Sequence, residues 1–147
     1  MLRGLRIDRA QRRRMTVALG LLVAGGAATA AAEGACNAPQ QAMQQIELMF
    51  GRNIGGRLGV SETAWSRFLA HEVTPRFPDG LTVVNASSQW RDKERGALVR
   101  EPSKLLTIVT AQDPATPNKI AAIVAAYKRA FRQQSVAVIT RSVCAAF

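Results

Sequence analysis

The chain has 147 residues, with 20 lysines and arginines against 10 acidic residues, so its formal net charge is +10. This length fits a single domain. Residues 1–32 contain six arginines and one aspartate and carry +5 of that charge, which leaves +5 for the rest of the chain. A surplus of this size is compatible with an ordinary solvated surface, so the charge does not argue for a nucleic-acid partner.

Residues 1–32 have the composition of a secretory signal peptide. Arginines are concentrated before residue 15, and the following segment 15–32 is apolar and rich in alanine and glycine. Alanines at 30–32 predict cleavage before Glu33, and cleavage after Ala35 also fits. A retained anchor is the alternative, but about 18 apolar residues is short for a membrane span. We therefore expect a bacterial periplasmic or secreted protein without a stable membrane span. The arginine run leaves both the general secretory and the twin-arginine routes open.

The two cysteines, Cys36 and Cys144, lie near the two ends of the expected mature chain. An even number of cysteines in an oxidising compartment predicts a disulfide bond between them. Lipidation of Cys36 is the alternative, although Glu33 occupies a position that is apolar in a lipidation signal. Metal ligation is not expected, because His71 is the only histidine and the cysteines are far apart. We expect His71 at the surface.

Six elements follow a tether at residues 33–44, and together they predict one domain over residues 45–147. Alternating apolar residues indicate strands, and apolar residues spaced three and four apart indicate helices. The predicted elements are a strand at 46–51, a helix at 61–74, a strand at 81–90, a strand within 98–111, a helix at 116–131 and a strand at 135–140. Ser61 and Thr116 are the expected helix N-caps. Pro102 predicts an edge position or a bulge in the third strand.

The order strand, helix, strand, strand, helix, strand predicts an α+β fold of the ferredoxin-like, split βαβ kind. Right-handed crossovers would place both helices on one face of a four-stranded antiparallel sheet. The expected core is Phe50, Trp65, Phe68, Leu69, Ile123, Tyr127 and Phe131. The other sheet face would be polar, shelter a ligand, or pair with a second copy of the chain in a homodimer.

A charged stretch follows the first predicted helix. Glu72 lies seven residues after Trp65 and four after Phe68, so a helical wheel places it along the apolar stripe. A carboxylate in that position needs a partner, because an unpaired buried charge is costly. Arg76 and Arg52 are the nearest candidates.

Two interpretations of these charges remain open. In the simpler one, Glu72 and Arg76 form an ion pair that fixes the turn after the helix. In the other, the charged residues converge on a pocket for a small polar or anionic ligand, with Trp90 either covering the core or stacking on the ligand. The candidate ligand-binding residues are Arg52, Glu72, Arg76, Trp90, Glu101 and Lys104.

Several separated blocks of the sequence resemble one family of uncharacterised bacterial secreted proteins. The blocks are ELMFGRNI, EVTPRFPDGLTVV, QWR, REPSK and AAYKRAFRQQSV with a late cysteine. They resemble domain-of-unknown-function family 3574 over residues 44–147. The resemblance implies export and a small α+β fold, and it implies no activity and no catalytic residue.

The function expected from the sequence is therefore broad. A non-catalytic envelope or secreted protein that binds a small polar or anionic ligand, or another protein, is the first hypothesis. The alternative is a small enzyme that uses Glu72 as acid or base, with arginines that hold an anionic substrate. No cofactor is expected. Nucleic-acid binding is not expected either, because the strands lack interleaved aromatic and basic residues.

Overall fold

The computed structural model describes residues 36–92, 94 and 96–147, so the predicted signal peptide lies outside the described residues. Helix α1 continues directly into a π-helical turn, η1, and the short strands β2 and β3 form a small hairpin between β1 and α1. The elements are β1 Gln41–Gly51, β2 Asn53–Ile54, β3 Arg57–Leu58, α1 Glu62–Phe68, η1 Leu69–Val73, β4 Thr82–Arg91, β5 Leu98–Thr110, α2 Thr116–Phe131 and β6 Ala137–Ala145.

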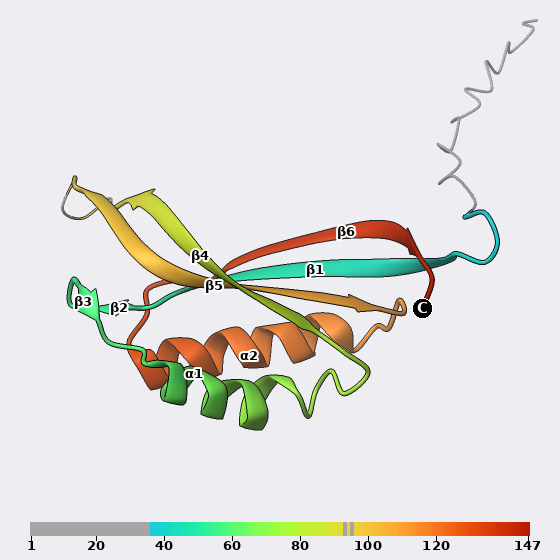
Figure 1. The fold of residues 1–147 in the computed structure, drawn as a ribbon, viewed down its shortest axis with the longest axis horizontal. Helices are drawn as coiled ribbons and strands as arrows, with labels where there is room; N and C mark the ends of the chain where they lie inside the picture. Colours follow the sequence, from blue (N-terminus) through green and yellow to red (C-terminus); the bar gives the residue numbers. More distant parts are fainter. Residues whose placement is uncertain (1–35, 93, 95) are drawn as a thin grey trace, which may run out of the picture. The chain divides into compact units, whose positions relative to one another are not determined.

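The four long strands form one antiparallel sheet in the order β4-β5-β1-β6. Both helices lie side by side on one face of this sheet (Figure 1). The predicted α+β class, with two helices and a four-stranded antiparallel sheet, is confirmed. Strand β1 begins at Gln41, so the last four residues of the predicted tether belong to the sheet.

The core lies between the sheet and the helices. Ile46, Leu48 and Phe50 alternate along β1 and are at most 1% exposed, because every second side chain faces the helices. Aromatic rings fill the centre, with the ring centroids of Phe50 and Tyr127 4.6 Å apart. All seven predicted core residues lie here; Leu69 and Phe131 are partly buried and pack against the buried cluster.

Helix α1 begins as predicted and ends differently. Ser61 is the N-cap, and its hydroxyl accepts a hydrogen bond from the backbone N–H of Ala64 at 3.1 Å. The last turn is π-helical, since the N–H of Thr74 donates to the carbonyl of Leu69 at 2.9 Å. A π turn adds a residue to one turn of helix. The regular 3.6-residue wheel therefore misplaces the side chains that follow.

The second helix spans the predicted residues 116–131, but its N-cap differs from the predicted one. Ala115 is its N-cap and Thr116 is the first helical residue, which corrects the predicted cap. No side chain among the described residues caps the helix; Asp113, two residues before Ala115, accepts a hydrogen bond from the N–H of Ala115 on its Oδ1 at 2.8 Å. This hydrogen bond, together with Lys119 nearby, lowers the pKa of Asp113.

Strand β5 is an interior strand, and its pairing with β4 continues through Ser87 opposite Pro102, so no bulge lies there. The ladder with β1 ends at Ser103, however, so Pro102 has a strand neighbour on one side only and lies at a local edge. The carbonyl of Pro102 faces β1 and accepts from the N–H of Arg52, one residue after β1 ends at Gly51. The proline nitrogen faces the same side, where the ladder with β1 has already ended, so no ladder hydrogen bond is lost.

The predicted disulfide is confirmed between Cys36 and Cys144, whose Cα atoms lie 5.5 Å apart. Cys36 precedes β1, and Cys144 lies in β6 opposite Ala42 of β1. The bond therefore joins the segment before the first strand to the last strand of the sheet.

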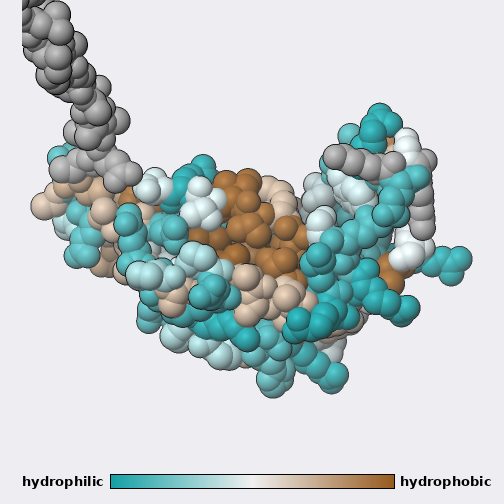
Figure 2. All heavy atoms as spheres, turned by 180° about the vertical axis from the view of Figure 1, so that it is seen from behind, coloured by the Kyte–Doolittle hydropathy of each residue, from teal (hydrophilic) through white to brown (hydrophobic). Residues whose placement is uncertain are grey.

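The sheet face opposite the helices is not covered by any described part of the chain. It carries exposed apolar side chains, among them Met49, Val84 and Ile139, which are 38%, 51% and 43% exposed. Figure 2, which shows the molecule from behind, has an apolar area bordered by hydrophilic residues. Pairing of two copies through the open sheet face stays a prediction.

Candidate functional site

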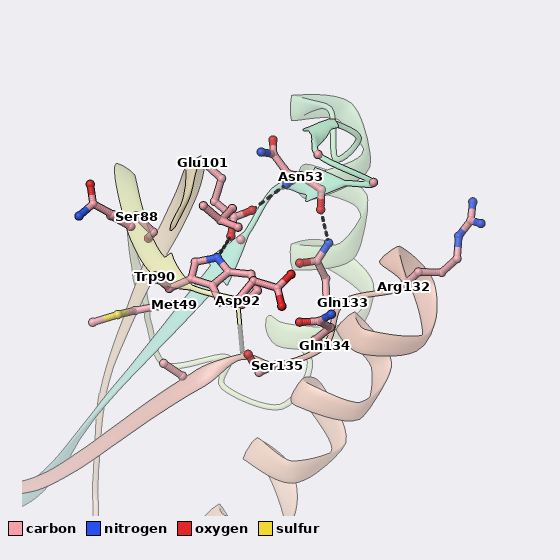
Figure 3. A pocket seen from close by; sticks show the side chains of 16 residues that line it. Met49, Asn53, Ser88, Trp90, Asp92, Glu101, Arg132, Gln133, Gln134 and Ser135 are labelled. Atoms are coloured by element: carbon pink, nitrogen blue, oxygen red, sulfur yellow. Dashed lines mark hydrogen bonds between the residues drawn. The ribbon is translucent and has the colours of Figure 1, made fainter. Parts of the chain in front are cut away.

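A cavity of about 540 Å³ lies at the end of the open sheet face (Figure 3). Three neighbouring strands contribute Met49 from β1, Trp90 from β4 and Glu101 from β5. The segment that connects α2 to β6 closes another side with Gln133, and Asn53 comes from the β2–β3 hairpin. The cavity is therefore lined by residues that lie far apart in the sequence, from Met49 to Ala137.

Glu101 is the central polar group of this site. It is 8% exposed, and its carboxylate accepts two hydrogen bonds. Oε1 accepts from the indole Nε1 of Trp90 at 2.8 Å, and Oε2 accepts from the backbone N–H of Asn53 at 3.0 Å. A carboxylate offers about four lone-pair sites. Both oxygens of Glu101 can therefore accept further hydrogen bonds from a bound molecule.

Gly51 lets Glu101 lie against the end of β1. A Cβ atom at Gly51 would fall 2.6 Å from Oε1 of Glu101, closer than nonbonded atoms approach. The carbonyl of Gly51 accepts a hydrogen bond from the Tyr127 hydroxyl at 2.8 Å. Burial raises the pKa of Tyr127, with the negative charge of Glu101 adding to the rise and Arg52 opposing it.

The far wall is fixed by the end of α2. Arg132 caps this helix in the left-handed conformation, with a φ of 51°, and this turn leads the chain toward the cavity. The side-chain amide of Gln133 then donates to the carbonyl of Asn53 at 2.7 Å. The same asparagine donates its backbone N–H to Glu101, so one residue links the helix end to the carboxylate.

Arg52 and Lys104 belong to a different group of charges, on the helix side of the sheet. Both are buried, and both bind the carboxylate of Glu62 in the first turn of α1, at 2.6 Å and 2.7 Å. Lys104 also donates to the side-chain oxygen of Asn85 at 2.5 Å, and Arg52 donates to the carbonyl of Val60 at 2.9 Å.

These contacts lower the pKa of Glu62. The hydrogen bond from Lys104 is the largest cause, and the charges of Arg52 and Lys104 together with the hydrogen bond from Arg52 outweigh desolvation, which acts in the opposite direction. One carboxylate thus binds two buried cations and holds the start of α1 against β5. The cluster explains the burial of both cations without a ligand.

The structure separates Glu72 from Arg52. Glu72 has a side chain 37% exposed and pairs with Arg76 at 3.1 Å, one helical turn further along the chain. Glu72 is only partly buried, and it lies within the π turn, where a regular 3.6-residue wheel does not give the direction of a side chain. The simpler interpretation, an ion pair that holds the turn after α1, agrees with these contacts.

Of the six candidate residues, the structure brings only Trp90 and Glu101 together at the cavity. Glu101 and Lys104 are three residues apart on β5, so their side chains lie on opposite faces of the sheet. Asn53, Gln133 and the backbone of Gly51 were not predicted. Asn53 and Gln133 lie in the segments RNIGG and RQQS, which were predicted as connections and where no periodicity indicates the direction of a side chain. Gly51 ends the predicted first strand, and the sequence does not show that its missing side chain makes room for Glu101.

Residues 36–92, 94 and 96–147 contain no group of three histidine, cysteine or acidic side chains that could hold a metal ion. No helix within these same ranges is long and apolar enough to cross a membrane.

The chain belongs to the family described as protein of unknown function (DUF3574), whose model matches residues 45–147. This family was the one identified from the sequence blocks. No curated protein matches the chain.

Solved structures show a similar fold. A phage SAM lyase in complex with S-methyl-5'-thioadenosine matches with a TM-score of 0.57 and 18% identity, over 70% of this chain and 90% of that chain. The same kind of lyase in its apo state matches with a TM-score of 0.52, 16% identity and coverage of 72% and 92%. CutA from Synechococcus elongatus PCC7942 matches with a TM-score of 0.47, 11% identity and coverage of 72% and 82%. At 18% and 16% identity the likeness to the two lyase structures concerns the fold alone.

Proposed function

We propose that the protein is an exported, non-catalytic binding protein that takes a small polar molecule into the cavity beside Glu101 and Trp90. The observation that carries this proposal is a buried carboxylate at the wall of a cavity of about 540 Å³. Cavities of this size with a few convergent polar groups are typical of small-molecule sites. The order of strands and helices is that of the ferredoxin-like class, which we adopt as the fold class.

Export is supported by two features. Disulfide bonds such as Cys36–Cys144 persist mainly in oxidising compartments. The composition of residues 1–32 is that of a signal peptide. Together they favour a periplasmic or secreted protein.

A polar rather than an anionic ligand is favoured because the two cations expected to hold an anion do not line the cavity. Arg52 and Lys104, which were expected to hold an anion, are already bound to Glu62. The similar phage lyase is described in complex with S-methyl-5'-thioadenosine, which makes a nucleoside of that kind a sensible first probe for this fold.

The enzyme alternative in which Glu72 acts as acid or base receives no support from the contacts. Glu72 is not among the residues that line the cavity, and Arg76 already binds its carboxylate. Glu101, in contrast, already lines the cavity, so a binding role for it does not require an existing ion pair to break.

A thermal-shift screen of the purified, oxidised protein tests the proposal. Polar envelope metabolites and S-methyl-5'-thioadenosine are the probes, and a binder should raise the melting temperature in a concentration-dependent way. Glu101→Gln should remove the shift, whereas Glu72→Gln, outside the cavity, should keep it. A ligand whose shift is lost in Glu72→Gln and kept in Glu101→Gln would show that the site lies elsewhere.

A further inference from the structure

The carboxylate of Glu101 has no counter-ion in the described structure. Its two partners are the Trp90 indole and a backbone N–H, which are both neutral. No lysine or arginine of the described residues lies within 4.0 Å of it, although five other ion pairs meet that distance. Burying a charge without an opposite charge is costly. A positive group in the adjoining cavity would reduce this cost.

Trp90 offers a second attraction for positive charge. Its indole is 37% exposed and lines the cavity, while its N–H is held by the Glu101 carboxylate. Aromatic faces attract cations, and tryptophan does so most strongly. A hydrogen bond to a carboxylate increases the electron density of the ring, which strengthens that attraction.

The Glu101 carboxylate contrasts with the charge of the domain as a whole. Residues 33–147 carry +5, from 14 basic and 9 acidic residues. Arg132 is among the residues that line the cavity, but its side chain points away from it (Figure 3). A buried carboxylate at the cavity wall, without a counter-ion among the described residues, favours ligands of positive charge.

We infer that the ligand of this cavity is a small organic cation with an alkylated charged centre, such as a quaternary ammonium group. The charge would lie between the Glu101 carboxylate and the face of Trp90. Its alkyl groups would contact the apolar part of the wall, to which Met49, Val99 and Ala137 contribute. The polarisable thioether of methionine suits such contacts. This inference rests on the proposed function, since it names the chemical class of molecule that the cavity would bind.

Choline and its neutral isostere 3,3-dimethylbutan-1-ol test the inference, because the two differ in charge and little in shape. Binding to the oxidised protein is followed by tryptophan fluorescence at constant ionic strength. Trp65 is buried in the core, so the signal that changes should be that of Trp90. We expect choline to bind at least about tenfold more tightly than the isostere.

Glu101→Gln should reduce this preference to near unity, and Glu72→Gln should leave it unchanged. If Glu101→Gln does not fold, Trp90→Leu followed by calorimetry provides the same test, because it removes the aromatic face. Equal binding of choline and the isostere would overturn the inference. So would an unchanged preference for choline in the Glu101→Gln or Trp90→Leu protein.

Failure of the inference and failure of the proposed function give different results. A neutral polar compound that binds in the cavity and loses binding on Glu101→Gln would overturn only the cationic class. The absence of any binder, both in the screen and with choline, would overturn the proposed function and the inference together.

Discussion

Gly51→Ala is expected to destabilise the protein by forcing Glu101 out of its position. The new Cβ would lie 2.6 Å from Oε1 and 2.8 Å from the carboxyl carbon of Glu101. The φ of Gly51 is not positive, so alanine fits the backbone and the cost arises from this contact alone. To relieve it, Glu101 must weaken its hydrogen bonds to Trp90 and Asn53.

The magnitude follows from those two bonds. A hydrogen bond to a charged group contributes about 1.5–3 kcal/mol, so loss of both would cost roughly 3–6 kcal/mol. Alanine stabilises the protein by about 0.4–1 kcal/mol, because it restricts the unfolded chain more than glycine does. The side chain of Glu101 can also move and so relieve part of the clash. We therefore expect Gly51→Ala to lower the free energy of unfolding by about 2–4 kcal/mol.

A double-mutant cycle isolates the contact. Chemical denaturation gives the free energy of unfolding for the wild type, Gly51→Ala, Glu101→Ala and the double variant. In the Glu101→Ala background the clash is absent, so Gly51→Ala should be neutral or stabilise by up to about 1 kcal/mol. Gly51→Ala combined with Glu72→Ala is the matched control and should be additive. If the Gly51 and Glu101 effects add to within about 0.5 kcal/mol, the proposed contact does not explain the glycine.

Three further predictions concern stability. Replacing Cys36 and Cys144 with serine should lower the free energy of unfolding by about 5 kcal/mol in the chain-entropy model, given their separation of 108 residues; an unchanged denaturation midpoint would contradict it. The pKa of Glu62 is lowered in the folded protein, so its stabilising contribution is present above its ordinary pKa of 4.5 and is lost as the pH falls through the folded value. The difference in melting temperature between the wild type and Glu62→Gln should therefore shrink below pH 4.5, and a difference that does not depend on pH would count against the pairing with Lys104. Tyr127→Phe should cost about 1–3 kcal/mol, because a buried carbonyl loses its donor, and the raised pKa of Tyr127 predicts that the wild type loses stability above pH 10 as the folded form resists ionisation. The pH dependence of denaturation should lose this alkaline component in Tyr127→Phe.

The fold could be predicted because its signals are periodic and local. Alternation in β1 and the stripe of Ile120, Ile123 and Tyr127 in α2 give both the type of element and its buried face. The even number of cysteines, together with the export expected from residues 1–32, predicted the disulfide.

The charged site was predicted poorly because its geometry depends on breaks in that periodicity. Glu72 lies within a single π turn, where a regular wheel does not give the direction of a side chain, and no residue between Leu69 and Val73 signals this turn in the sequence. Glu101 and Lys104 looked like neighbours in the chain, yet a strand places them on opposite faces. The cavity itself needs the left-handed turn at Arg132, a conformation that arginine rarely adopts.

The disulfide makes residues 36–144 a covalently closed ring, since the two cysteines join the segment before β1 to the end of β6. A protease cut in the connection between β4 and β5 would leave a single molecule of unchanged mass apart from one added water. The two pieces would separate only after the disulfide is reduced. A chain opened at that connection is therefore expected to keep the native order of strands in the sheet.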